Sequence, residues 1–156
     1  MSIFLDYLKE HEELIKNLSS LDENVQIVSD CFVSSIKSGN KILVCGNGGS
    51  ASDAQHFASE LTGRFIDDRI PLPAVSLATD SSALTCISND FSFDHVFSRQ
   101  IEAIGTEGDC LMCISTSGIS NNLILKLQYF GIMQRYIQLM MLHLPLLKQE
   151  LDIRGI

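Results

Sequence analysis

"GNGGSASDAQHFASELTGRF", residues 46–65, is the stretch that decides the fold, and it follows a short apolar run, "ILVC", at residues 42–45. An apolar run that ends in a glycine turn and leads into a helix is typical of α/β domains. In "GNGGS" the glycines let the backbone approach a ligand closely, and the following helix begins with exposed N–H groups. The stretch therefore predicts an anion-binding site at the end of a strand.

The glycine turn has two other interpretations. Gly46, Gly48 and Ala51 satisfy the looser dinucleotide pattern G-x-G-x-x-A. However, no acid ends a second strand about 20 residues further on, since Asp80 lies too far away, and no Lys-Ser/Thr pair forms a Walker loop. A tight turn without a ligand is the remaining alternative.

A second polar turn, "STSGIS", occupies residues 115–120 after the apolar run at residues 110–114. Its hydroxyls come from Ser115, Thr116, Ser117 and Ser120. Taken alone, this turn is consistent with an ordinary helix N-cap. Because α/β sheets bind ligands at the carboxyl ends of parallel strands, we expect the two turns to form one site.

The other elements follow the same alternation. The sequence predicts helices over 3–18, 22–38, 50–62, 81–88 and 93–105, and strands over 41–45, 72–78 and 110–115. This order predicts an α/β layered domain with a mainly parallel sheet, and a length of 156 residues fits one domain over 1–156. Residues 123–147, rich in Leu, Ile, Met and Gln, favour helix and contain no convincing fourth strand.

Charge and composition restrict the partners. A net charge of -8 argues against a general nucleic-acid or anionic-membrane binder. The start, "MSIFLDYLKEHEEL", lacks the basic residues and uninterrupted apolar core of a signal peptide, and residues 139–147 are too short to span a membrane. We expect a soluble cytoplasmic protein that contacts neither nucleic acid nor membrane. The apolar-rich stretch from Cys110 to Gln149 contains no acid, which also favours self-association.

The five cysteines are an odd count, which favours free thiols. Cys110 and Cys113 match C-x-x-C, but residues i and i+3 of a strand point to opposite faces. We therefore expect buried structural thiols rather than redox or metal chemistry.

Two polar pairs are candidates for chemistry. His56 and Glu60 are four residues apart and share one helix face, as an ordinary surface pair would. The alternative is a catalytic carboxylate beside a metal ligand or a hydrogen-bonding imidazole. Asn89 and Asp90 either cap a loop or reach substrate hydroxyls, and their spacing does not decide between these roles.

The motifs "CGNGGSASDAQHFASELTGRF", "ISNDF" and "GDCLMCISTSGIS" resemble those of the phosphoheptose isomerases, SIS-domain proteins that act on sedoheptulose 7-phosphate. The resemblance covers about residues 1–126. It implies a three-layer, flavodoxin-like α/β fold with N-terminal helices, assembled as a homotetramer with active sites at subunit interfaces. It also implies aldose–ketose isomerisation of a small phosphorylated sugar, for heptose and lipopolysaccharide precursor synthesis.

The resemblance assigns roles to matching positions. Glu60 would move a proton between two sugar carbons, and His56 with Glu60 would supply part of a zinc site found in some family members. The substrate contacts would come from three groups: Asn47, Gly48 and Gly49; Asn89 and Asp90 on the sugar; and Ser115, Thr116, Ser117 and Ser120 on the phosphate.

The chain departs from the family in two places. Ile119 replaces the asparagine of the usual TSGNS loop, and the tail lacks the family's R-I-Q-E-x-H helix. Gln138 and His143 echo that helix, but they are five residues apart where the family has eight, so those roles are not transferred. The change in residues 127–156 suggests a shifted reading frame or a deletion.

Two function classes follow from these departures. Retention of Glu60 favours an isomerase. The altered tail favours a non-catalytic SIS protein that binds a sugar phosphate or associates with a replication initiator, or an inactive degenerate isomerase.

Overall fold

The structure is a computed structural model that describes residues 2–124 and 136–139. The described residues fall into two compact units, residues 2–30 and the part of the chain from residue 31 onward. The first unit contains α1 (Ile3–Asn17), η1 (Leu18–Leu21) and the start of α2 (Asp22–Lys37). None of the described helices is long and apolar enough to cross a membrane.

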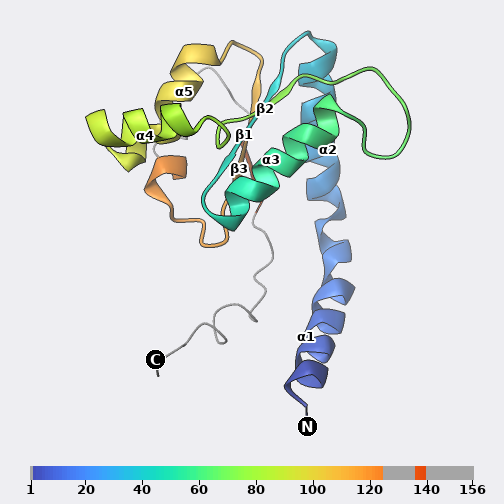
Figure 1. Ribbon diagram of the computed structural model, residues 1–156. Coiled ribbons are helices and arrows are strands. Elements are labelled where there is room, and N and C mark those ends of the chain that lie inside the picture. The colour runs from blue at the N-terminus through green and yellow to red at the C-terminus, as the bar shows by residue number, and fades with distance from the viewer. Residues whose placement is uncertain (1, 125–135, 140–156) are drawn as a thin grey trace, which may run out of the picture. The chain divides into compact units, whose positions relative to one another are not determined.

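The second unit begins within α2 and alternates strands with helices (Figure 1). Its further elements, in chain order, are β1 (Ile42–Gly46), α3 (Gly49–Thr62), β2 (Ala74–Ser76), α4 (Ser81–Asp90), η2 (Phe93–His95), α5 (Val96–Ile104), β3 (Cys110–Ile114) and β4 (Tyr136–Leu139). The strands and helices predicted before residue 120 are all present. The helix predicted over 93–105 is divided between η2 and α5.

The sheet has the strand order β2-β1-β3-β4, and every neighbouring pair is parallel. The fourth strand corrects the sequence analysis, which predicted none. Strand β4 pairs with β3 from Leu111↔Tyr136 to Ile114↔Leu139. The prediction of helix over 123–147 is therefore wrong at residues 136–139, where the aromatic Tyr136 and the β-branched Ile137 suit a strand beside β3. The other residues of 125–156 lie outside the described part of the chain.

Helices cover both faces of the sheet, and Figure 1 shows α3 on one side and α4 with α5 on the other. Alternate residues of β1 and β3 form one buried cluster with α5, together with Leu77, Ala78 and Leu123. On the opposite face, Cys110 contacts the backbone oxygen of Cys31 in α2, and the rings of Phe32 and Phe57 pack 5.8 Å apart. The three-layer α/β architecture predicted from the sequence is thus confirmed.

The prediction of free thiols holds for all five cysteines, and the prediction of burial holds for four of them. All five are free; Cys31, Cys45, Cys110 and Cys113 are buried, whereas Cys86 is exposed on α4. The sulfur atoms of Cys45 and Cys113 lie 3.5 Å apart on adjacent strands. The hydrogen bond with Cys113 and burial both raise the pKa of Cys45, so this thiol stays protonated.

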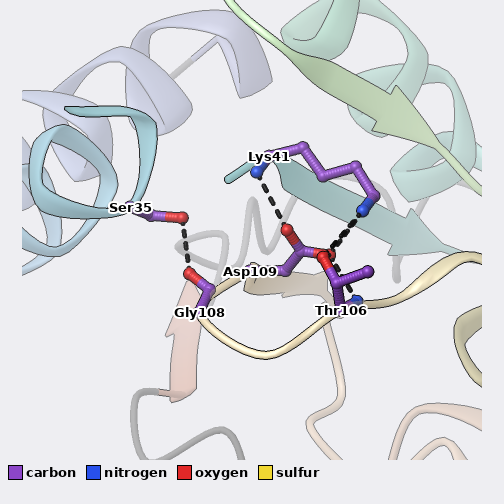
Figure 2. A network of polar contacts seen from close by, with 5 residues as sticks. All are labelled: Ser35, Lys41, Thr106, Gly108 and Asp109. Carbon is purple, nitrogen blue, oxygen red and sulfur yellow. Dashed lines mark hydrogen bonds and ion pairs between the residues drawn. The ribbon is translucent and has the colours of Figure 1, made fainter. Parts of the chain in front are cut away.

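A buried ion pair joins the amino ends of β1 and β3 (Figure 2). The fully buried Asp109 carboxylate lies 2.6 Å from the Lys41 ammonium and also accepts hydrogen bonds from the backbone N–H of Lys41 and from Thr106. The Ser35 hydroxyl of α2 donates to the Gly108 carbonyl in the same turn. These bonds fix the end of the sheet that lies away from both glycine and serine turns.

Candidate functional site

The two polar turns leave the same edge of the sheet from neighbouring strands. Gly46 at the end of β1 pairs with Ile114 at the end of β3. After β1 the chain leads to β2, and after β3 it leads to β4. Strands β2 and β4 lie on opposite sides of the central pair β1 and β3. This divergence is the topological switch point at which open α/β sheets bind ligands.

The first turn, residues 46–49, presents backbone donors. Gly46 has no room for a side chain, because a Cβ there would collide with the backbone oxygen of Ser50. Gly48 adopts φ +57°, a conformation that favours glycine, and α3 begins without a side-chain cap. Within the described residues, the N–H groups of Gly48 and Gly49 have no hydrogen-bond acceptor. They are therefore available to an anion.

The serine loop, residues 115–120, is held by its own hydroxyls. The oxygen of Ser115 accepts from the N–H of Gly118 at 3.0 Å, and the oxygen of Ser117 accepts from the N–H of Ile119 at 3.3 Å. The two hydroxyl oxygens lie 3.5 Å apart, with Ser115 buried and Ser117 exposed. One of the two hydroxyls donates to the other, so the second keeps a proton that it can donate to a phosphate oxygen.

One pair of side chains joins the first turn to the start of the helix that follows the serine loop. Asn47 and Asn122 exchange two amide hydrogen bonds, each 2.9 Å long, and Asn122 is only 3% exposed. We call this the amide pair. The sequence analysis missed Asn122; a polar residue two positions after the serine loop, at the start of the next helix, is the signal that could have indicated it. The glycine turn is therefore bonded to the segment that directly follows the serine loop.

His56 and Glu60 lie together on α3, as their spacing predicts. Their Nε2 and Oε1 atoms are 3.6 Å apart, and the side chains are 76% and 31% exposed. Arg69, which the sequence analysis also missed, donates to the backbone oxygens of Glu60 and Leu61 and so fixes the end of the helix that bears the carboxylate. At 1.5 Å per residue, Glu60 lies about 16 Å along α3 from Gly49.

Asn89 and Asp90 form a separate group at the end of α4. The Asn89 amide donates to the Asp90 carboxylate at 2.8 Å, and the Cys86 thiol donates to its other oxygen at 3.4 Å. These hydrogen bonds, that of Asn89 first, hold the pKa of Asp90 below its ordinary value. No hydrogen bond links this group to the described residues of either turn, so their predicted contact with the sugar stays a prediction.

The candidate zinc ligands are incomplete among the described residues. Zinc generally takes three or four protein ligands, and His56 with Glu60 supplies two. No group of three His, Cys, Asp or Glu side chains that could hold a metal occurs in residues 2–124. Gln138 lies in β4 rather than in a helix, and His143 lies outside the described part of the chain. The described residues therefore do not fit a complete zinc site.

The strand order, the glycine turn and the serine loop define a doubly wound α/β domain with an anion site at its switch point. The sequence pattern of the SIS domain matches residues 6–129. The chain belongs to the SIS domain family, and both turns and helix α3 lie within the matched residues.

Individual relatives are phosphoheptose isomerases. Those of Aliarcobacter butzleri and Campylobacter concisus are 50% and 54% identical to the chain, over 79% and 74% of its length. The solved phosphoheptose isomerase of Neisseria gonorrhoeae is 46% identical and superposes with a TM-score of 0.69 over 80% of this chain and 63% of its own. That of Francisella tularensis is 35% identical, with a TM-score of 0.73 over 81% and 69%.

The chain spans only part of these relatives. It covers 65% of the length of the Aliarcobacter protein and 59% of the Campylobacter protein. The shared part includes the glycine turn, the serine loop and the helix that bears Glu60.

Proposed function

We propose that the chain is a phosphosugar isomerase that interconverts sedoheptulose 7-phosphate and D-glycero-D-manno-heptose 7-phosphate. The observation that carries this proposal is that both turns leave the same edge of the sheet and that the glycine turn is bonded to Asn122, directly after the serine loop, in a domain about half identical to phosphoheptose isomerases. Backbone N–H groups and serine hydroxyls bind phosphate without a basic side chain, which suits a chain of net charge -8. The aldose product would serve heptose synthesis for surface polysaccharides.

Glu60 is the proposed base. Starting from the ketose, its carboxylate removes a proton from C1 while the C2 oxygen takes a proton from a water molecule, which gives a cis-enediol. Glu60 then returns its proton to C2, and the C1 hydroxyl gives its proton back to the hydroxide left by that water, which leaves the aldehyde. The Glu60 side chain is 31% exposed and its resolved ion-pair partner is His56, not a Lys or Arg of the described residues, so the carboxylate can be reached by a substrate carbon.

Assembly of several copies is part of the proposal. In one chain, Glu60 lies about 16 Å along α3 from the glycine turn. A second copy that places its own α3 beside the turns would bring carboxylate and phosphate site together, and the family resemblance implies a homotetramer with active sites at subunit interfaces.

A non-catalytic sugar-phosphate-binding protein is the second candidate. It is favoured by the separation within one chain between Glu60 and the turns, and by a chain that covers 59–65% of its isomerase relatives. Both candidates bind the ligand through the turns. Only the isomerase requires the Glu60 carboxylate, so substitution of this residue separates the two.

Removal of the serine-loop hydroxyls should weaken ligand binding. Each hydrogen bond to a charged phosphate contributes about 1.5–3 kcal/mol, so Ser117→Ala and Ser120→Ala should each lower the affinity for sedoheptulose 7-phosphate about 10- to 150-fold. Titration calorimetry measures this, with the exposed Ser82→Ala of α4 as control. Unchanged affinity in both loop variants would mean that the loop is only a helix cap.

We also expect weak zinc binding, because the described residues offer two ligands and not three or four. Elemental analysis after mild chelation should find well under one zinc per chain, and His56→Ala should remove the remainder. Stoichiometric zinc that survives chelation would contradict this expectation and would point to ligands beyond the described residues, His143 first.

The chain should self-associate through α1. No residue of this helix is buried, and Phe4, Leu8 and Ile15 form a stripe on one face, with Phe4 and Ile15 69% and 63% exposed. Exposed apolar stripes usually mark contacts between chains. Light scattering should give a tetramer for the native chain and smaller species for Phe4→Glu combined with Ile15→Glu, but no change for Glu13→Gln. A monodisperse native monomer would refute the assembly.

A further inference from the structure

We propose that Asn122 is a positioning residue that holds Asn47, so that the glycine turn and the serine loop act as one rigid binding site. The inference rests on the proposed function for the identity of the ligand. The amide pair itself is an observed contact, since two hydrogen bonds of 2.9 Å join Asn47 of the glycine turn to Asn122, directly after the serine loop. Among the described residues, it is the only side-chain hydrogen bonding between the glycine turn and the segment that begins with the serine loop.

The glycine turn needs such a constraint. A Cβ added to Gly48 or Gly49 would meet nothing within 4 Å, so neighbouring side chains do not pack against this part of the backbone. Both glycines are exposed, and Gly48 adopts a conformation open mainly to glycine. Backbone hydrogen bonds from Ser50 and Ala51 hold the carbonyls of Asn47 and Gly48 against the start of α3. Within the described residues, the Asn47 side chain is what ties this turn to the segment after the serine loop.

Asn122 is suited to hold Asn47 because it is itself fixed. Its side chain is 3% exposed, and it lies between the serine loop and Leu123, a residue of the core cluster. Burial makes both of its hydrogen bonds necessary, since an unpaired amide in the interior is costly. The pair also restricts how Asn47 meets a ligand. Each amide uses one N–H and one oxygen lone pair, which leaves Asn47 a second N–H and a second lone pair for substrate.

The test combines ligand affinity with backbone exchange. Asn122→Ala should lower the affinity for sedoheptulose 7-phosphate at least about tenfold in calorimetry. In an Asn47→Ala background, the same change should alter affinity less than about twofold, because Asn122 then has no partner to position. Asn121→Ala, an exposed neighbour in the same helical turn, is the matched control and should leave affinity unchanged. Additive losses in the double variant would overturn the positioning role and leave Asn122 a purely structural residue.

A second variant and a measurement without ligand distinguish a local effect on the glycine turn from general misfolding. Asn122→Asp keeps the size of the side chain but sets a carboxylate oxygen against the Asn47 oxygen, so it should also weaken binding. In hydrogen-exchange mass spectrometry, Asn122→Ala and Asn122→Asp should speed exchange in residues 46–52 and leave α5 unchanged. Unchanged exchange in residues 46–52 would overturn the inference whether or not a ligand binds. A native chain that binds no sedoheptulose 7-phosphate would instead overturn the proposed function alone.

Discussion

Glu60→Gln is expected to lower the rate of isomerisation about 10²–10⁴-fold, the range typical for loss of a general base. The amide keeps the size of the carboxylate and much of its hydrogen bonding, but it does not accept a proton at neutral pH. The backbone of this turn should not move, because Arg69 holds the backbone oxygens of Glu60 and Leu61 through contacts that the substitution leaves in place. Affinity for sedoheptulose 7-phosphate should therefore change little.

The experiment compares steady-state rates with binding. The loss should fall on kcat rather than on the dissociation constant, since the carboxylate acts on the reacting carbons and not on the phosphate. Gln55→Glu is not a suitable control because the Gln55 side chain holds the backbone of Ala78. Glu13→Gln on α1 is suitable, since this exposed residue lies far along the chain from both turns. Activity that persists in Glu60→Gln would exclude Glu60 as the base.

Asp109→Ala is expected to lower the free energy of unfolding by about 3–5 kcal/mol, the range for loss of one partner from a buried ion pair. The carboxylate is fully buried, and its removal leaves Lys41 and Thr106 without the acceptor that they share. Urea unfolding measures the change. Glu107→Ala is the matched control, because this acid is exposed in the same turn and should cost little. Equal effects of the two substitutions would contradict the role assigned to the network.

The same ion pair predicts a dependence on pH. Burial, the largest single effect, acts to raise the pKa of Asp109, but the hydrogen bonds from Lys41 and Thr106 hold it below its ordinary value of 3.8. A carboxyl whose pKa is lower in the folded state stabilises the fold above its unfolded pKa. The difference in unfolding free energy between the native chain and Asp109→Asn should therefore be constant near pH 7. It should decline as the pH falls below 3.8 toward the pKa of the folded state.

Most of the fold could be predicted because its signals are local. The apolar run before Gly46 and the glycine turn after it define β1 and the start of α3, and the same pattern at residues 110–120 defines β3 and the serine loop. Strand β4 could not be predicted in this way. Its residues lie in a segment rich in helix-forming Leu, Met and Gln, and the strand exists through pairing with β3, more than 20 residues away in the sequence.

The candidate site, like the fold, could be predicted from the sequence only where it depends on local patterns. The residue types of the turns and the spacing of His56 and Glu60 are visible in the sequence, since they depend on neighbours three or four residues apart. The amide pair depends on contact between residues 47 and 122, which only the parallel register of β1 and β3 brings together. The general expectation of buried thiols does not hold for Cys86, which is exposed on α4 and contacts Asp90.

The most direct test of the proposed activity is proton NMR of sedoheptulose 7-phosphate incubated in D2O with the native chain and with Glu60→Gln. The account predicts that aldose signals of D-glycero-D-manno-heptose 7-phosphate appear with the native chain, with deuterium at C2 from exchange of the proton held by Glu60, and that both are lost or strongly slowed in the variant. An unchanged ketose spectrum with a native chain that binds the ligand in calorimetry would contradict the isomerase and would leave a sugar-phosphate-binding protein.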